Sequence, residues 1–356
     1  MTRRTALLVA FAFVACSFFA VSAALAGTNV TLVETGSSLL YPLFGTWLPQ
    51  FNKENPGIRI EPSSTGSGAG IAQAVAGRVQ IGASDAFMSD TQLHGHAGIL
   101  NIPLAISAES INYNLPGLSN VALKLDGPTI AGIYSGTIRS WDAQAIAALN
   151  PGVKLPHHDI IPVRRRDGSG STFIFTQFLT FSTPDWDAGP SFGETIDWPS
   201  VPGEQAADGN EGVLKASKTT PYSIAYLGIS YQRQITQAHL GTAMLKNEDG
   251  SFVLPTVKTI YSAAASLGPR TPPDERLSLV FAPGQYSYPL INYEYAIVSK
   301  NQSSSAVADA LRTFLFWSIE PCSGNAAKTL DAVHFIALPE YIRALSYSQI
   351  ESIKGP

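Results

Sequence analysis

From residue 29 onward, apolar positions recur with two periods, the two-residue period of strands and the three- to four-residue period of helices. Residues 30–34 (Val-Thr-Leu-Val-Glu) and 58–61 (Ile-Arg-Ile-Glu) predict strands. Between them, six apolar residues fall on one face of a predicted helix: Leu40, Leu43, Phe44, Trp47, Leu48 and Phe51. Strands that alternate with helices in this way predict an α/β fold.

The rest of the chain repeats this alternation. Strands are predicted at residues 79–82, 129–134, 160–163, 222–227 and 294–299, and helices at residues 70–76, 142–149, 173–179 and 306–318. Residues 183–212 are rich in Pro, Gly, Asp and Trp, which predicts surface loops with little regular structure. A length of 356 residues suggests about two domains.

The N-terminus has the pattern of a secretory signal peptide. Arg3 and Arg4 precede an apolar run from residue 6 to residue 20, and Ala24-Leu25-Ala26 offers a small-residue cleavage site. An uncleaved anchor helix is one alternative. A lipoprotein processed before Cys16 is another, although Phe13 fits poorly in the segment that precedes a lipidated cysteine. We expect residues 1–26 to be removed and the protein to be periplasmic or extracellular.

The net negative charge of the chain limits which ligands it can bind and how it can bind them. The formal net charge of −4 becomes −6 once residues 1–26, which hold two arginines and no acid, are removed. A negative chain lacks the basic footprint of a nucleic-acid-binding protein. With only two cysteines in the sequence, a zinc site built from cysteines is excluded. If the ligand is an anion, a few local donors must hold it, because the overall field is repulsive.

Three glycine-serine turns supply such donors. They lie at residues 36–38 (Gly-Ser-Ser), 65–70 (Thr-Gly-Ser-Gly-Ala-Gly) and 167–172 (Asp-Gly-Ser-Gly-Ser-Thr), each between a predicted strand and a predicted helix. Free amides and the positive end of the helix dipole favour an anion at such a position. Ser and Gly are also ordinary capping residues. The third turn, however, follows three arginines at 164–166, whose planar guanidinium groups suit oxyanions.

Several longer strings resemble the phosphate-binding subunit of bacterial phosphate ABC importers. They lie at residues 82–85 (Gly-Ala-Ser-Asp), 88–90 (Met-Ser-Asp), 112–118, 133–142 and 163–170. The resemblance runs from about residue 34 to 182 and returns at 222–228 and from 289 onward. It implies a type II periplasmic-binding-protein fold, in which two α/β lobes are joined by two crossing strands around a ligand cleft. Residues 27–104 and 289–356 would form lobe I, and residues 105–288 lobe II.

The resemblance also implies a set of ligand-binding residues. These are the Ser38 hydroxyl, the Leu39 amide, Ser67, Asp85, Arg165, Ser169, Gly170 and Ser171, with Asp167 as a carboxylate that supports Arg165. The chain departs from the family pattern at three places: Ser38-Leu39 stands for Thr-Phe, Gly68-Ala69 for Ser-Gly, and Ser171 for Thr. Because these positions keep their hydrogen-bonding capacity, we expect the departures to tune affinity without changing the ligand.

Asp85 is the residue expected to select the ligand. An ionised carboxylate only accepts hydrogen bonds, so it can hold an oxyanion only if that anion still carries a proton. Phosphate carries one or two protons near neutral pH, and sulfate carries none. Facing sulfate, Asp85 would therefore cause repulsion and lose a hydrogen bond. The alternative role of Asp85 is that of a loop cap.

We therefore expect a monomeric, non-enzymatic binding protein that captures inorganic phosphate and delivers it to the permease and ATPase subunits of an importer, without metal or cofactor. A secreted phosphatase is the alternative from another class. The chain lacks G-x-S-x-G and H-E-x-x-H motifs, and the histidine pairs His94/His96 and His157/His158 fit surface loops. A phosphate receptor without a transport role is a further alternative.

Overall fold

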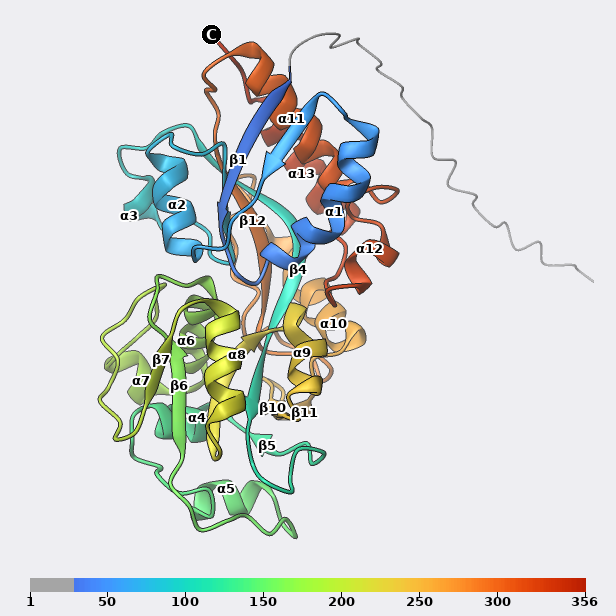
Figure 1. Ribbon diagram of the computed structural model, residues 1–356. Helices are drawn as coiled ribbons and strands as arrows, with labels where there is room; N and C mark the ends of the chain where they lie inside the picture. Colours follow the sequence, from blue (N-terminus) through green and yellow to red (C-terminus); the bar gives the residue numbers. More distant parts are fainter. Residues whose placement is uncertain (1–28) are drawn as a thin grey trace, which may run out of the picture.

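The computed structural model describes residues 29–356, which form two lobes stacked one above the other (Figure 1). The predicted signal peptide at residues 1–26 lies outside the described residues. A nine-stranded sheet runs through both lobes in the order β2-β1-β3-β12-β4-β8-β6-β7, and β9 pairs with β4. This arrangement is the predicted α/β fold with two lobes.

Lobe I contains the first and last parts of the described chain. Its strands are β1 (Val30–Gly36), β2 (Ile58–Glu61), β3 (Ile81–Ser84) and β12 (Ile291–Ser299), and its helices are α1 (Tyr41–Glu54), α2 (Ser67–Val75), α3 (Asp90–Leu93), α11 (Ser305–Ile319), α12 (Ala327–Asp331) and α13 (Glu340–Glu351). The pairings of β1 with β2 and β3 are parallel, and β12 is antiparallel to β3.

The predicted apolar face of α1 is buried against α11. Phe44, Trp47 and Phe51 are fully buried. The ring of Phe314 on α11 lies 5.1 to 5.9 Å from the rings of these three residues, centroid to centroid. Aromatic contacts at these distances add packing energy to the burial of apolar surface. The helical periodicity around residues 40–51 is therefore confirmed.

Lobe II holds the middle of the chain. Its part of the large sheet consists of β6 (Ile161–Arg165), β7 (Gln205–Ala207), β8 (Ser223–Gly228) and β9 (Gly241–Thr242), and a small sheet contains β5 (Lys124–Leu125), β10 (Met244–Lys246) and β11 (Phe252–Val253). Its helices are α4 (Gly127–Tyr134), α5 (Gln144–Leu149), α6 (Gly170–Ser182), α7 (Pro184–Ala188), α8 (Gly209–Thr219), α9 (Gln232–Gln237) and α10 (Val257–Leu267), with short 3-10 turns η1 (Ile229–Tyr231) and η2 (Gly268–Arg270).

One long strand belongs to both lobes. In β4 (Ile99–Tyr113), residues 99–108 pair with β12 and residues 109–113 pair with β8. The chain returns to lobe I immediately before β12, where the Glu109 amide donates to the Leu290 carbonyl at 2.9 Å. The boundary predicted between residues 104 and 105 falls within β4, and the other falls just before β12. The division into lobes at these residues stays a prediction.

Two predictions of local structure are wrong. Residues 129–134 form helix α4 and not a strand, because the Asp126 carboxylate accepts the Thr129 amide at 3.0 Å as an N-cap and Pro128 stands in the first turn. Residues 183–212 contain α7, β7 and the start of α8. Trp186 and Trp198 anchor this region, with ring centroids 6.2 Å apart. None of the helices between residues 29 and 356 is long and apolar enough to span a membrane.

Candidate anion-binding site

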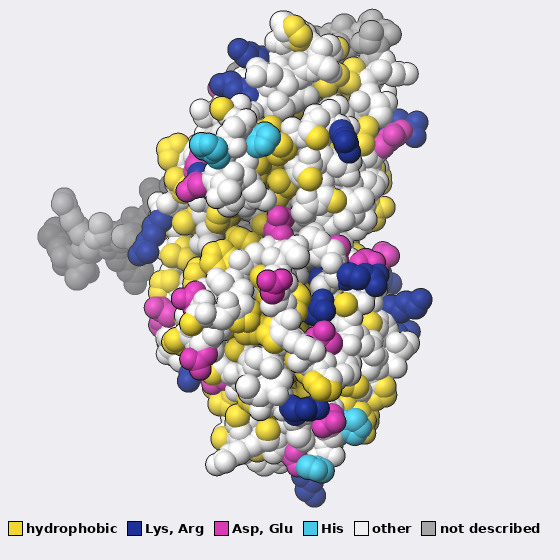
Figure 2. Space-filling model, turned by 90° about the vertical axis from the view of Figure 1, so that its left-hand side faces the viewer, with side chains coloured by type: hydrophobic (Ala, Val, Ile, Leu, Met, Phe, Trp, Pro, Cys, Tyr) yellow, Lys and Arg dark blue, Asp and Glu magenta, His cyan; other side chains and the backbone are white. Residues whose placement is uncertain are grey.

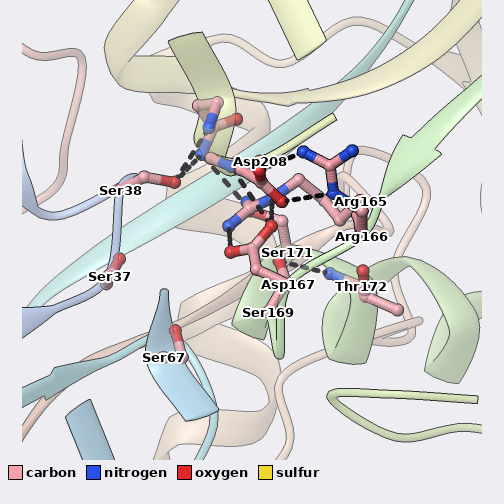
Figure 3. A network of polar contacts seen from close by, with 12 residues as sticks. Ser37, Ser38, Ser67, Arg165, Arg166, Asp167, Ser169, Ser171, Thr172 and Asp208 are labelled. Atoms are coloured by element: carbon pink, nitrogen blue, oxygen red, sulfur yellow. Dashed lines mark hydrogen bonds and ion pairs between the residues drawn. The ribbon is translucent and has the colours of Figure 1, made fainter. Parts of the chain in front are cut away.

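The N-terminal ends of α2, α6 and α8 and the turn before α1 meet where the two lobes face each other (Figure 3). Ser37, Ser38 and Ser67 come from lobe I, and Arg165, Asp167, Ser169 and Ser171 come from lobe II. The serines and Arg165 are all at least 97% buried. The structure therefore brings the three glycine-serine turns of the sequence into one enclosed, polar place.

The first turn depends on Gly36. Its φ angle is +143°, and a Cβ atom there would lie 2.0 Å from the Ala83 carbonyl oxygen, so only glycine fits. The next residue, Ser37, donates its amide to the same carbonyl at 2.9 Å. The Ser37 hydroxyl accepts the Leu40 amide at 2.9 Å and donates to Asp85 Oδ1. This turn is thereby fixed to the end of β3 and to Asp85.

Ser38 links the two lobes. Its hydroxyl oxygen accepts the backbone amide and the Nδ2 atom of Asn210, both at 3.0 Å, and it keeps its own proton to donate. The Leu39 amide donates to the Ser37 hydroxyl at 3.1 Å, and the Leu39 side chain packs against Gly228 of lobe II. The Leu39 carbonyl accepts the hydroxyl of Ser230 at 2.8 Å.

Asp85 lies between the second and third turns. It is 1% exposed, and its amide donates to the Ser67 hydroxyl at 3.2 Å. Gly170 of lobe II lies directly opposite: a Cβ atom at Gly170 would lie 2.6 Å from Asp85 Cβ and 2.7 Å from Ser67 Oγ. The lobes can approach this closely only because residue 170 has no side chain.

Arg165, at the end of β6, supplies the buried positive charge. Its Nε atom donates to Asp167 Oδ1 at 2.7 Å, Nη2 donates to Oδ2, and Nη1 donates to the Ser171 hydroxyl at 3.3 Å. Burial lowers the pKa of Arg165, but the hydrogen bonds and charge of Asp167 outweigh this effect and the net pKa is raised. The guanidinium group therefore stays charged and is held in one orientation.

The flanking arginines have other partners. Arg164 pairs with Glu204 at 3.1 Å and lies over the ring of Trp198. Arg166 is exposed and pairs with Asp208 (Figure 3). In the third turn, the Ser169 hydroxyl caps α6 by accepting the Thr172 amide at 3.2 Å. Of the three adjacent arginines, only Arg165 is directed to the place where the turns meet.

The lobes are closed against each other over this site. The Gly68 amide donates to the Gly168 carbonyl at 3.1 Å, and Gln92 Nε2 donates to Glu194 Oε2 at 3.3 Å. On the face that Figure 2 shows, the surfaces of the two lobes meet, and acidic and basic side chains are interspersed over both. An anion held here would be out of contact with bulk water, so each hydrogen bond to it would be stronger than at the surface.

Sequence reasoning missed Asn210, the second residue of α8. Its Nδ2 atom also lies 3.4 Å from Ser171 Oγ, and its Oδ1 atom accepts the Gly228 amide at 2.8 Å. Asn210 therefore connects Ser38 of lobe I with Ser171 at the start of α6 and with Gly228 at the end of β8. The preceding Asp208-Gly209 pair is a turn signal like the other three, but it lies in the stretch that was interpreted as loop.

Sequence reasoning also missed polar residues on the crossing strands beneath the site. Glu109 on β4 and Asn292 and Glu294 on β12 are fully buried. Asn292 Nδ2 donates to the Asp85 carbonyl, and Ser107 donates to Glu294 Oε1. An acid within a strand of mostly apolar neighbours is the signal that could have pointed to Glu109.

Asp85 and Glu294 are buried close together, and Arg165 is the cation near them. Burial and then the charge of Asp85 raise the pKa of Glu294 far above its ordinary value. Burial raises the pKa of Asp85 too, but the hydrogen bond from Ser37, the neighbouring Glu294 carboxyl group and the charge of Arg165 oppose the rise. We therefore assign the proton to Glu294 and the negative charge to Asp85. Within residues 29–356, no cluster of three or more His, Cys, Asp or Glu is arranged to hold a metal ion.

Two lobes around an enclosed, donor-lined site define the class of two-lobed solute-binding proteins. A family model described as a PBP superfamily domain matches residues 22–321. A Pasteurella multocida protein named phosphate-binding protein PstS is 32% identical over 312 residues, which cover 88% of this chain and 87% of that protein. A namesake from Xylella fastidiosa is 31% identical over 311 residues, or 87% and 82% of the two chains.

Solved structures show the same fold. A Clostridium perfringens structure, described as a phosphate ABC transporter substrate-binding protein with bound phosphate, superposes with a TM-score of 0.61 at 16% identity and covers 87% of this chain and 100% of that one. A phosphate-binding protein from Stenotrophomonas maltophilia gives a TM-score of 0.68 at 19% identity, with coverage of 90% and 93%. The chain belongs to the PBP superfamily and, within it, to the family of phosphate-binding proteins.

Proposed function

We propose that this protein captures inorganic phosphate outside the cytoplasm and delivers it to an ABC-type importer. Family membership supports the ligand and the transport role, and the N-terminal sequence supports export. Permease and ATPase subunits are the expected partners, and the protein acts as a monomer. The proposal includes binding without chemical turnover.

The observation that carries the ligand assignment is the buried carboxylate of Asp85, which lies among hydrogen-bond donors where the three turns meet. Arg165, the hydroxyls of Ser38, Ser67 and Ser171 and the start of α6 favour an oxyanion. Asp85 adds one acceptor, which only a protonated oxyanion can satisfy. We propose Ser38, Leu39, Ser67, Asp85, Arg165, Ser169, Gly170 and Ser171 as the phosphate-binding residues, with Asp167 orienting Arg165.

The test is the substitution Asp85→Asn, read by titration calorimetry with phosphate, arsenate and sulfate. The amide can donate to sulfate, so the preference for phosphate over sulfate should fall by about 100-fold, which corresponds to roughly 3 kcal/mol. Asp126→Asn is the matched control, because it removes one acid from a helix cap outside the site and asparagine also caps helices. Unchanged selectivity in Asp85→Asn would refute this role of Asp85.

Two further measurements separate the alternative functions. A phosphatase would release p-nitrophenol from p-nitrophenyl phosphate, and we expect no turnover by the purified protein. A receptor without a transport role would bind phosphate equally well but would not support uptake. Phosphate uptake into cells that contain the cognate permease and ATPase should depend on this protein, and uptake that persists without it would contradict the importer role.

A further inference from the structure

Glu109 is a buried acid whose carboxyl oxygens lack normal hydrogen bonds. It is 0% exposed, and among the described residues neither Oε1 nor Oε2 has a hydrogen-bond partner of acceptable geometry. Burying a carboxyl group without a hydrogen-bond partner is energetically costly, so such a group is unusual unless a bound ligand supplies the partner. The family-derived site does not include this residue.

The position of Glu109 places it at the floor of the site. It lies on β4 opposite Gly228 of β8, at the point where β4 passes from one lobe to the other. The Gly228 amide donates to Asn210, and Asn210 in turn donates to Ser38 and approaches Ser171. The Glu109 carboxyl group itself lies near the Ser171 hydroxyl and within the electrostatic influence of Asp85 and Arg165.

We propose that Glu109 is a further phosphate-binding residue, which donates a hydrogen bond from its protonated carboxyl group to an oxygen of the ligand. This inference rests on the proposed function. It assigns to the same site one acid that accepts a hydrogen bond from phosphate, Asp85, and one acid that donates a hydrogen bond to phosphate, Glu109. Phosphate, which has both P–OH groups and unprotonated oxygens, suits both.

The charged surroundings favour a protonated Glu109. The titratable and charged groups around it are Asp85 after β3, Arg165 on β6, Tyr226 on β8, Tyr288 before β12 and Glu294 on β12. Arg165, the nearby cation, is already paired with Asp167. The Tyr288 hydroxyl donates to the backbone carbonyl of Glu109 at 2.9 Å and leaves the carboxyl group unsupported.

The pH response of binding follows from this arrangement. The net pKa of Glu109 is raised to about 8, and burial is the main cause. The nearby Ser171 hydroxyl and the charge of Arg165 lower the pKa, whereas the charge of Asp85 raises it. Below pH 8 the group is neutral and can donate. Above pH 8 it becomes a buried anion that repels phosphate, so affinity should fall about tenfold for each further pH unit.

The experiment compares phosphate binding by the wild type, Glu109→Gln and Glu109→Leu at pH 6.5 and pH 9.5, using titration calorimetry. At pH 6.5, Glu109→Leu should bind at least 30-fold more weakly than the wild type, because it has no donor. Glu109→Gln keeps an N–H donor and should lose only three- to tenfold. Between pH 6.5 and pH 9.5, the wild type should lose about 30-fold more affinity than Glu109→Gln. Titration of phosphate itself affects all variants equally and cancels in this ratio.

Glu275→Gln is the matched control. Glu275 is also fully buried, and burial raises its pKa to about 8, but it bonds Ser346 and Gln349 outside the site. This variant should keep the wild-type pH profile of binding. Wild-type affinity in Glu109→Leu at pH 6.5, or a wild-type pH profile in Glu109→Gln, would overturn the inference. A Glu109→Gln loss above 30-fold at pH 6.5 would also overturn it, since Glu109 would then act as an acceptor. A wild-type protein that does not bind phosphate would instead refute the proposed function.

Discussion

Gly170 should determine whether the lobes can close, and Gly170→Ala tests this directly. The added Cβ atom would lie 2.6 Å from both Cβ and Oδ2 of Asp85 and 2.7 Å from Ser67 Oγ. Carbon atoms in contact prefer about 3.5 to 4.0 Å, so the facing walls would have to separate by about 1 Å. All the clashing atoms belong to the opposite lobe. The substitution should therefore leave each lobe folded and oppose only the closed state.

The cost of this separation follows from the hydrogen bonds that span the site. The Asn210 amide and Nδ2 atom reach Ser38 at 3.0 Å, and the Gly68 amide reaches Gly168 at 3.1 Å. A displacement of about 1 Å would break these three bonds. At about 1 kcal/mol each, their loss totals about 3 kcal/mol, which is roughly 100-fold in affinity for a ligand that requires closure.

Calorimetry with phosphate and small-angle X-ray scattering with and without phosphate provide the assay. We expect Gly170→Ala to bind about 100-fold more weakly and to show less compaction than the wild type at saturating phosphate. Its thermal unfolding without ligand should be no lower, because alanine is a better helix former than glycine at the start of α6. Gly168→Ala is the control in the same turn: its Cβ atom would make an ordinary contact of 3.4 Å with Gly68. Equal affinities of the two variants would refute the reasoning.

Two further predictions concern Asn210, which links Ser38 to lobe II, and the buried acid Glu275. Asn210→Ala should weaken phosphate binding about tenfold and lower the free energy of unfolding by about 1 to 2 kcal/mol, because Ser38 loses the Nδ2 donor while keeping the backbone amide, and the buried Gly228 amide loses its acceptor. Calorimetry and urea denaturation measure the two effects, and unchanged affinity would contradict the role of Asn210 as a link between the lobes. Burial raises the pKa of Glu275 from 4.5 to about 8, so the folded protein keeps a proton that the unfolded chain releases, and the free energy of unfolding should fall as pH rises between these values, by about 4 to 5 kcal/mol in all. Urea denaturation from pH 5 to pH 8 should show a slope shallower by about 1.4 kcal/mol per pH unit in Glu275→Gln, and an unchanged slope would exclude Glu275 as the source.

The sequence was most informative where one local rule controls the structure. The apolar periodicity predicted helix α1 correctly because Phe44, Trp47 and Phe51 all pack against the same helix, α11. The glycine-serine turns could be found from sequence because their backbone conformation requires glycine, as at Gly36 with its φ angle of +143°.

Other features depend on tertiary contacts that no short pattern records. Strand β4 carries Asn, Ser and Glu side chains that are all buried, so it shows neither clean alternation nor a purely apolar run. Glu109 gains its importance only because Gly228 and Ser171 are brought beside it. Helix α4 has the composition of a strand, and its helical form depends on the Asp126 cap and on packing against α6.

The sharing of β4 and β12 also affects the order in which the molecule can assemble. Lobe II is built largely from one continuous stretch, whereas lobe I needs β12, whose register joins Tyr295 to Ser84 across more than 200 residues of chain. Loop closure over such a distance is slow. We therefore expect lobe II to become protease-resistant first during refolding. The part of lobe I that holds Asp85 should become ordered later, when β12 pairs with β3 and Asn292 Nδ2 donates to the Asp85 carbonyl. Recovery of ligand binding should therefore mark the last step of folding.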